Sequence, residues 1–166
     1  PFYHVRDFCV HMLDIGTSEE TLFRRLHKSC IQRKIVRSMR EQVRVDEGRT
    51  SELLRLFYRL FVVTRRRHGL PPPPKTWFRN LVHSFGPDLT IRIASKLGTP
   101  LAAIMTLKFK DVLTYKYGAS DAKFHALGGM QSLLWSAIQD AKSENIEKID
   151  FGRSELNDRN LISFKD

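Results

Sequence analysis

Cysteine is scarce in this sequence, and no stretch of apolar residues is long. The two cysteines among its 166 residues, Cys9 and Cys30, belong to no CxxC or Cys/His pattern. Disulfide frameworks and recognisable metal sites are therefore excluded, and a reducing compartment is favoured. No apolar run approaches the ~20 residues that cross a bilayer, and the first residues lack the layout of a signal peptide. We expect a cytoplasmic protein without a transmembrane segment, and we expect no metal.

Acidic residues are too few to balance the basic ones. Lys and Arg number 28 against 18 Asp and Glu, which gives a net charge of +10 and an isoelectric point near 10.0. Such a charge attracts polyanions, whether nucleic acid, an anionic membrane surface or a phosphorylated substrate. The hydrophobic share of 42% predicts a folded chain, and its length suits one domain.

Hydrophobic periodicity predicts a mixed α/β fold. We expect strands at 2–13, 43–47, 89–95, 100–109, 112–119 and 147–151. Tight connections at 97–99 and 110–111 make the three central strands an antiparallel meander. Helices are expected from a capping box at Thr17 to residue 40, with a break near Ser29, at 51–67, at 77–85, and after Gly128. Four prolines at 71–74 predict a rigid loop within one domain.

Hydroxyl-bearing residues and a pair of glycines follow the last meander strand. Tyr115 and Tyr117 precede Ser120, and Gly128-Gly129-Met130 then open a helix. Glycines at a helix N-terminus let backbone N–H groups approach a pyrophosphate or carboxylate. An ordinary loop with a helix cap explains the same residues equally simply.

Two further segments contain candidate binding residues. Asp150 lies near the end of the final strand, Arg153 follows Gly152 just after it, and Lys165 follows an aromatic residue. Arg153 could bind phosphate or carboxylate, or pair with an aspartate of the chain itself. Residues 24–40 contain seven Lys and Arg, which indicate either a track for RNA or lipid phosphates or the solvated face of an amphipathic helix. No Gly-x-Ser-x-Gly, Walker or dinucleotide motif is present.

Taken in order, several segments resemble the FemAB-like branch of the GNAT acyltransferase superfamily. They are QRKIVRSMREQ, FYRLFVVTRRRHGLPPPPKTWFRNL, YKYGASD, HALGGMQSLLWSAIQDA, KIDFGRS and SFKD, within residues 18–166. Prototypes of this branch move an amino acid from aminoacyl-tRNA to the stem-peptide lysine of a peptidoglycan precursor. The resemblance implies a mixed, mostly antiparallel sheet with helices on both faces, splayed near its centre. It also implies that residues 1–166 form one GNAT-like domain of a longer two-module protein whose other module is missing here.

The resemblance assigns roles to individual residues. Lys165 would stabilise the developing oxyanion or bind phosphate, and Tyr117 would hydrogen-bond the acceptor. Gly128, Gly129 and Met130 would hold the donor. The remaining candidates for substrate binding are Tyr115, Ser120, Asp150, Arg153 and Trp77. Phe124 stands where cousins that use acetyl-CoA have Arg or Gln, which weakens the match to their pyrophosphate loop.

These observations predict an N-acyltransferase that moves an aminoacyl or acyl group to an amine acceptor in cell-wall or exopolysaccharide metabolism. The donor would be aminoacyl-tRNA or acyl-CoA, with no tightly bound cofactor. Residues 24–40 would contact RNA or an anionic surface, including the inner face of the membrane. The alternative is a non-catalytic basic module that binds RNA or anionic lipid.

Overall fold

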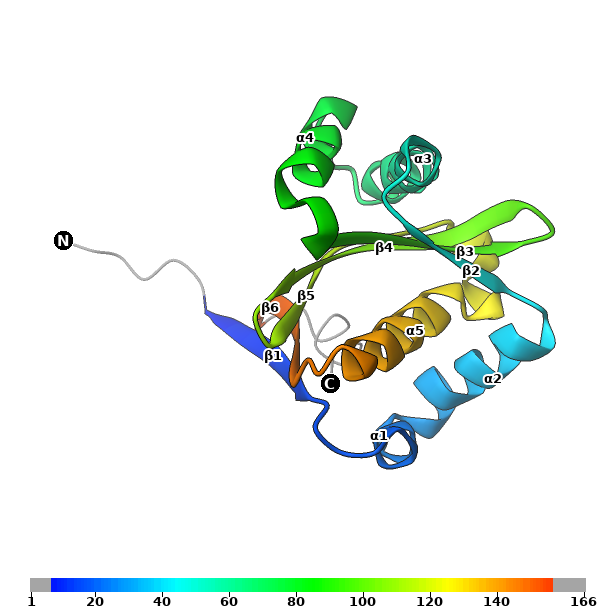
Figure 1. The fold of residues 1–166 in the computed structure, drawn as a ribbon. Coiled ribbons are helices and arrows are strands. Elements are labelled where there is room, and N and C mark those ends of the chain that lie inside the picture. Colours follow the sequence, from blue (N-terminus) through cyan, green and yellow to red (C-terminus); the bar gives the residue numbers. More distant parts are fainter. Residues whose placement is uncertain (1–6, 157–166) are drawn as a thin grey trace.

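A computed structural model describes residues 7–156 as a six-stranded sheet covered by helices (Figure 1). The strands are β1 (Phe8–Asp14), β2 (Arg44–Gly48), β3 (Leu89–Lys96), β4 (Thr99–Phe109), β5 (Val112–Ser120) and β6 (Lys148–Glu155). The α-helices are α1 (Glu19–Arg25), α2 (Arg33–Arg40), α3 (Ser51–Arg67), α4 (Lys75–Phe85) and α5 (Gly129–Ser143). Short helical turns occupy η1 (Lys28–Gln32), η2 (Gly86–Asp88) and η3 (Ala122–Leu127).

The strand order is β1-β6-β5-β4-β3-β2, and every neighbouring pair except β5 and β6 is antiparallel. The meander of β3, β4 and β5 is therefore confirmed. The predicted strand at 147–151 continues to Glu155, because β1 pairs with its second half.

Each face of the sheet packs against its own helices (Figure 1). Side chains alternate along β4, so that Ala102 and Ile104 face α5 whereas Ala103 and Met105 face α3. α1 and α2 extend the layer on the α5 side, and α4 extends the layer on the α3 side through the buried Phe78. The expected mixed fold with helices on both faces is confirmed.

The helices begin close to the expected positions, with one correction. Ser18, and not Thr17, caps α1, because its hydroxyl accepts a hydrogen bond from the backbone N–H of Thr21. The expected break near Ser29 is present, since η1 separates α1 from α2. The His27 side chain caps η1 by accepting a hydrogen bond from the backbone N–H of Cys30. The sequence offers Thr50 or Ser51 as the cap of α3, and the structure shows Thr50, whose hydroxyl accepts from the backbone N–H of Leu53.

The proline loop is tied to α3. The guanidinium of Arg65 donates to the carbonyl of Pro71 at 3.0 Å, and the hydroxyl of Tyr58 donates to the carbonyl of Pro73 at 3.1 Å. Prolines donate no backbone hydrogen bonds, but their carbonyls remain acceptors. The loop therefore fixes α4 relative to α3, as the composition predicts for a rigid connection.

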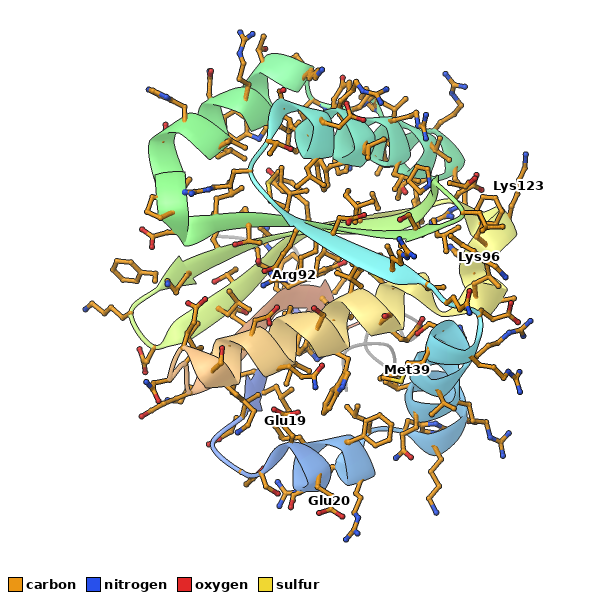
Figure 2. All side chains as sticks on the ribbon, turned by 45° about the vertical axis from the view of Figure 1, so that its right-hand side comes forward. Glu19, Glu20, Met39, Arg92, Lys96 and Lys123 are labelled. Carbon is orange, nitrogen blue, oxygen red and sulfur yellow. The ribbon has the colours of Figure 1, made fainter. Side chains whose placement is uncertain are left out.

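One buried cation joins the sheet to α5. Arg92 on β3 is 5% exposed and lies between the sheet and the helix (Figure 2). Its guanidinium contacts Asp140 at 3.0 Å, Glu47 at 2.9 Å and the hydroxyl of Thr106 at 3.1 Å. Since a buried charge is stable only when it is paired, these contacts fix the position of α5 on the sheet.

Candidate functional site

The sheet splits between β5 and β6. These parallel strands pair at three positions, the last being Thr114 with Asp150, and then part. Both strands carry an irregularity just beyond that pair. β5 gains an extra residue between Tyr115 and Tyr117 relative to β4, and β6 gains one relative to β1 beside Gly152. Bulges bend a strand and increase its twist, so two adjacent bulges direct β5 and β6 apart.

The bulge in β5 sends its two tyrosines to opposite faces of the sheet. In a regular strand Tyr115 and Tyr117 would share one face. Instead Tyr115 packs in the core on the α5 side, whereas Tyr117 packs in the core on the α3 side. The two hydroxyls therefore lie on opposite faces of the sheet, because the extra residue at Lys116 reverses the alternation.

A cavity of ≈ 400 Å³ lies at the end of β5. The strand contributes Tyr115, Gly118 and Ser120, and the start of α5 contributes Gly129 and Met130. The other lining residues are Lys34, Thr64, Arg67, His68, Leu101, Ala102, Ala119, Phe124, His125 and Gln131. A cavity of this volume is large enough for part of a small-molecule ligand, and most of its charged lining is cationic.

Ser120, one of the residues that line this cavity, is held in place by α3. Its backbone N–H donates to the Thr64 hydroxyl at 2.8 Å, and that hydroxyl donates to the Ser120 carbonyl at 3.0 Å. The Ser120 hydroxyl and the His125 Nε2 atom are 2.8 Å apart. Arg67 reaches the same nitrogen and the Ser120 carbonyl, each at 3.4 Å. These contacts connect the ends of β5 and α3 at the cavity.

The electrostatics of the cavity favour an anion. Partial burial lowers the pKa of His125, and the neighbouring charges of Arg67 and Lys34 lower it further, while Asp121 opposes the shift. His125 is therefore neutral at pH 7, and its Nε2 atom can accept the Ser120 proton. Burial also raises the pKa of Tyr115 to about 12, so its hydroxyl stays protonated. Arg67 and Lys34 remain as charged groups facing the cavity.

Three glycines allow close packing around the cavity. A Cβ atom on Gly118 would overlap the Tyr115 hydroxyl, so this glycine makes room for the tyrosine. Gly128 has a φ of 72° and lies against the backbone carbonyl of Lys34, where a Cβ atom would also overlap. Gly129 packs on Ala102 and, unlike Gly128, lines the cavity. Of the two glycines expected to hold the donor, Gly128 is thus covered by α2, whereas Gly129 lines the cavity.

Tyr117 and Trp77 form a separate aromatic group on the other face. The indole N–H of Trp77 on α4 donates to the Tyr117 hydroxyl at 3.2 Å. The Tyr117 ring packs edge-on against Phe61 and Phe78. Trp77 is 48% exposed, so this pair is accessible from solvent. Two of the expected site residues therefore meet, although neither of them lines the cavity.

The candidates on β6 lie beside the split. The Asp150 carboxylate accepts from the backbone N–H of Gly152 at 2.6 Å and stabilises the bulge there. The Arg153 guanidinium lies 4.5 Å from the centre of the Phe8 ring on β1. Neither residue lines the cavity. Lys165 lies outside the described residues.

Sequence reasoning missed the cavity residues that come from α3 and η3. Arg67 could be read as a helix-capping cation, and His125 has no neighbour at metal-ligand spacing. Thr64, Arg67 and His125 are separated by up to 61 residues and meet through the fold, so no local motif signals them. The basic segment at 24–40 gave a partial signal, because Lys34 belongs to it.

A family model for the acetyltransferase (GNAT) domain matches residues 23–160. The chain belongs to this family. The GNAT domain is 30% identical over 145 residues to the UDP-N-acetylmuramoylpentapeptide-lysine N(6)-alanyltransferase of Weissella viridescens, covering 84% of this chain and 42% of that protein. The resemblance to the FemAB-like branch is thus confirmed, and the non-catalytic alternative is not favoured.

Solved structures share the fold of this GNAT domain. The crystal structure of FemX has a TM-score of 0.83 at 13% identity, over 98% of this chain and 58% of that one. The C-terminal domain of a lysylphosphatidylglycerol synthetase from Agrobacterium fabrum, described as putative, has a TM-score of 0.65 at 12% identity, over 94% and 49%. The chain spans about half the length of these relatives. Among residues 7–156, no helix is long and apolar enough to cross a membrane.

Proposed function

We propose that this GNAT domain transfers an aminoacyl or acyl group from a phosphate-bearing donor to an amine acceptor in cell-wall metabolism. The observation that carries the proposal is the split between β5 and β6, which opens beside a cationic cavity at the N-terminus of α5. The alanyltransferase relative supports the reaction class, since its name states an alanyl transfer to a lysine nitrogen.

The reaction needs no covalent enzyme intermediate. The neutral amine attacks the ester or thioester carbonyl, and a C–N bond forms while the carbonyl oxygen becomes an oxyanion. The C–O or C–S bond then breaks, and the proton lost by nitrogen goes to the leaving oxygen or sulfur. A bulge leaves its extra residue outside the hydrogen-bonded ladder, so the backbone at Lys116 offers an N–H to the oxyanion. By the family resemblance, Lys165 adds a cation there.

The two substrates would bind at two separate places on the sheet, the donor in the cavity at the end of β5 and the acceptor beside α4. The donor phosphate binds near Lys34 and Arg67, where the N-terminus of α5 adds the positive end of a helix dipole. The acceptor binds on the face of Tyr117 and Trp77, with the Tyr117 hydroxyl as a hydrogen-bonding group. Gly129, Met130, Tyr115 and Ser120 shape the donor side, and Asp150 holds the bulge that parts the strands.

The donor is aminoacyl-tRNA in this proposal. Acyl-CoA would place its pyrophosphate over the glycines before α5, but the Lys34 carbonyl covers Gly128. The cationic side chains of Lys34 and Arg67 instead suit a nucleic-acid backbone, whose binding weakens steeply with salt.

The test is a transfer assay with charged tRNA and, in parallel, with acyl-CoA, against lysine-containing acceptors. Arg67→Gln should raise the KM for the donor with little change in kcat, whereas Arg66→Gln should change neither, because Arg66 is an exposed neighbour that does not line the cavity. Tyr117→Phe should raise the KM for the acceptor. Equal effects of the two arginine substitutions, or no turnover with either donor, would overturn the proposal.

A further inference from the structure

The outer side of α2 combines aliphatic and cationic side chains. Ile35 and Ser38 are buried, whereas Val36 is 55% and Met39 63% exposed. Three arginines of α2 are also exposed, at positions 33, 37 and 40. Exposed aliphatic side chains are costly in water, and here two of them lie within a basic helix of eight residues.

Two hollows extend this surface beyond α2. One, of ≈ 540 Å³, is lined by Phe23, Lys28, Gln32, Arg33, Val36, Arg37 and Arg40. The other, of ≈ 450 Å³, is lined by Arg40, Glu41, Gln42, Arg44, Ser95, Lys96, Leu97 and Gly98. Because Arg40 lines both, the surface is continuous from α2 to the turn between β3 and β4. Leu97 in that turn is 95% exposed. We call these residues, with Met39, the α2 surface.

The charge of the α2 surface is almost entirely positive. Its one carboxylate, Glu41, is 2.6 Å from the Lys96 ammonium and 3.8 Å from the Arg37 guanidinium. Within residues 7–156, no carboxylate lies within ion-pair distance of Lys28, Arg33, Arg40 or Arg44. The surface therefore presents four cations with no carboxylate at ion-pair distance among the described residues, around three exposed aliphatic side chains.

We propose that the α2 surface docks on an anionic membrane. Cations attract acidic headgroups, and aliphatic side chains between them enter the boundary between headgroups and acyl chains. RNA would gain little from the aliphatic groups, since nucleic-acid surfaces use aromatic rings for stacking on bases. The single aromatic residue of the α2 surface, Phe23, packs edge-on against Trp135, with 5.2 Å between the ring centres, and this contact already engages its ring.

The docking is separate from the transfer reaction. Lys34, which lines the donor cavity, is not part of the α2 surface. A failure of docking would therefore leave transfer to a water-soluble acceptor unchanged, and the two proposals can be tested apart.

Sedimentation with lipid vesicles tests the proposal. The chain should bind vesicles that contain phosphatidylglycerol and not vesicles of phosphatidylcholine alone, and binding should weaken with salt. Val36→Ser with Met39→Ser should lower the partition coefficient by about tenfold, as expected for two side chains removed from an apolar phase. The matched control is Val10→Ser with Met12→Ser on β1, where the same residue types are 66% and 50% exposed.

Arginine variants complete the test. Changing Arg33, Arg37 and Arg40 to Gln should abolish binding to the anionic vesicles. Changing Arg59 and Arg66 to Gln should not, because α3 lies on the opposite side of the sheet. Thermal unfolding of each variant establishes that it folds. The proposal is overturned if the chain does not bind anionic vesicles, or if the Val10/Met12 pair lowers vesicle binding as much as the Val36/Met39 pair. It is also overturned if the α2 arginine variant loses binding to RNA but keeps binding to anionic vesicles.

Discussion

Replacement of Gly118 by alanine tests the geometry of the cavity. A Cβ atom at this position would overlap the Tyr115 hydroxyl and lie 2.8 Å from its Cζ atom. The backbone conformation of Gly118 is open to alanine, since its φ is not positive. The effect of Gly118→Ala therefore comes from the contact with Tyr115 and not from backbone strain.

The expected loss is the cost of overpacking one methyl group. Insertion of a methyl group into a filled site costs about 1–3 kcal/mol of stability. To relieve the overlap, the Tyr115 ring would have to move into the cavity. With about 2 kcal/mol lost, the melting temperature should fall by about 4–8 °C in a chain of this size. Calorimetry measures this fall, and urea unfolding monitors the free energy independently.

Two variants make the prediction specific. Tyr115→Phe removes the oxygen that overlaps most but keeps the Cζ contact at 2.8 Å, so the double variant with Gly118→Ala should regain part of the stability that Gly118→Ala loses. Gly129→Ala adds the same methyl group beside the same cavity, but its Cβ atom would meet its nearest neighbours at 3.4 Å, and stability should not fall. If Gly118→Ala is harmless, or if Tyr115→Phe does not rescue it, the described packing of Tyr115 on Gly118 is incorrect.

Two further predictions concern charge. Glu47→Gln or Asp140→Asn alone should cost about 1 kcal/mol in urea unfolding, but the two together about 3 kcal/mol, because Arg92 then becomes a buried charge without a partner; additive losses would contradict this. Since the folded pKa of His125 lies below its ordinary value, the associated stability is present above about pH 6.5 and is lost as the pH falls through the folded pKa. In an NMR titration the pKa of His125 should lie below 6.5, and Arg67→Gln should raise it. The His125→Gln variant should lose less stability between neutral and acid pH than the unsubstituted protein does. A His125 pKa at the ordinary value would refute the lowered pKa.

Local patterns were sufficient to predict most of the fold. Alternating apolar residues in 89–119 and two tight turns specify an antiparallel meander, because each strand can pair with the next without distant information. The apolar stripe of α3 and its Thr50 cap are similarly local. The family resemblance added the split of the sheet, which no pattern in composition or spacing contains.

The site was less predictable, because a single extra residue decides which face a side chain occupies. The sequence Tyr-Lys-Tyr-Gly contains no signal for the bulge at Lys116, so the sequence alone does not predict that Tyr115 and Tyr117 lie on opposite faces. The cavity joins Thr64, Arg67 and His125 with Lys34 from α2, and each lies on a different element or turn of helix. Such groups become neighbours through packing of distant elements, which single-sequence patterns do not encode.

The pairing of β1 with β6 has a consequence for the order in which the protein can assemble during translation. Cys9 pairs with Ser154, which lies 145 residues later, so the ribosome needs about 7–30 s to supply that partner. The hairpins between β3 and β5 can close long before then. Until β6 emerges, the nascent β1 lacks the strand with which it pairs in the folded protein, so its backbone hydrogen-bonding groups stay open to other strands.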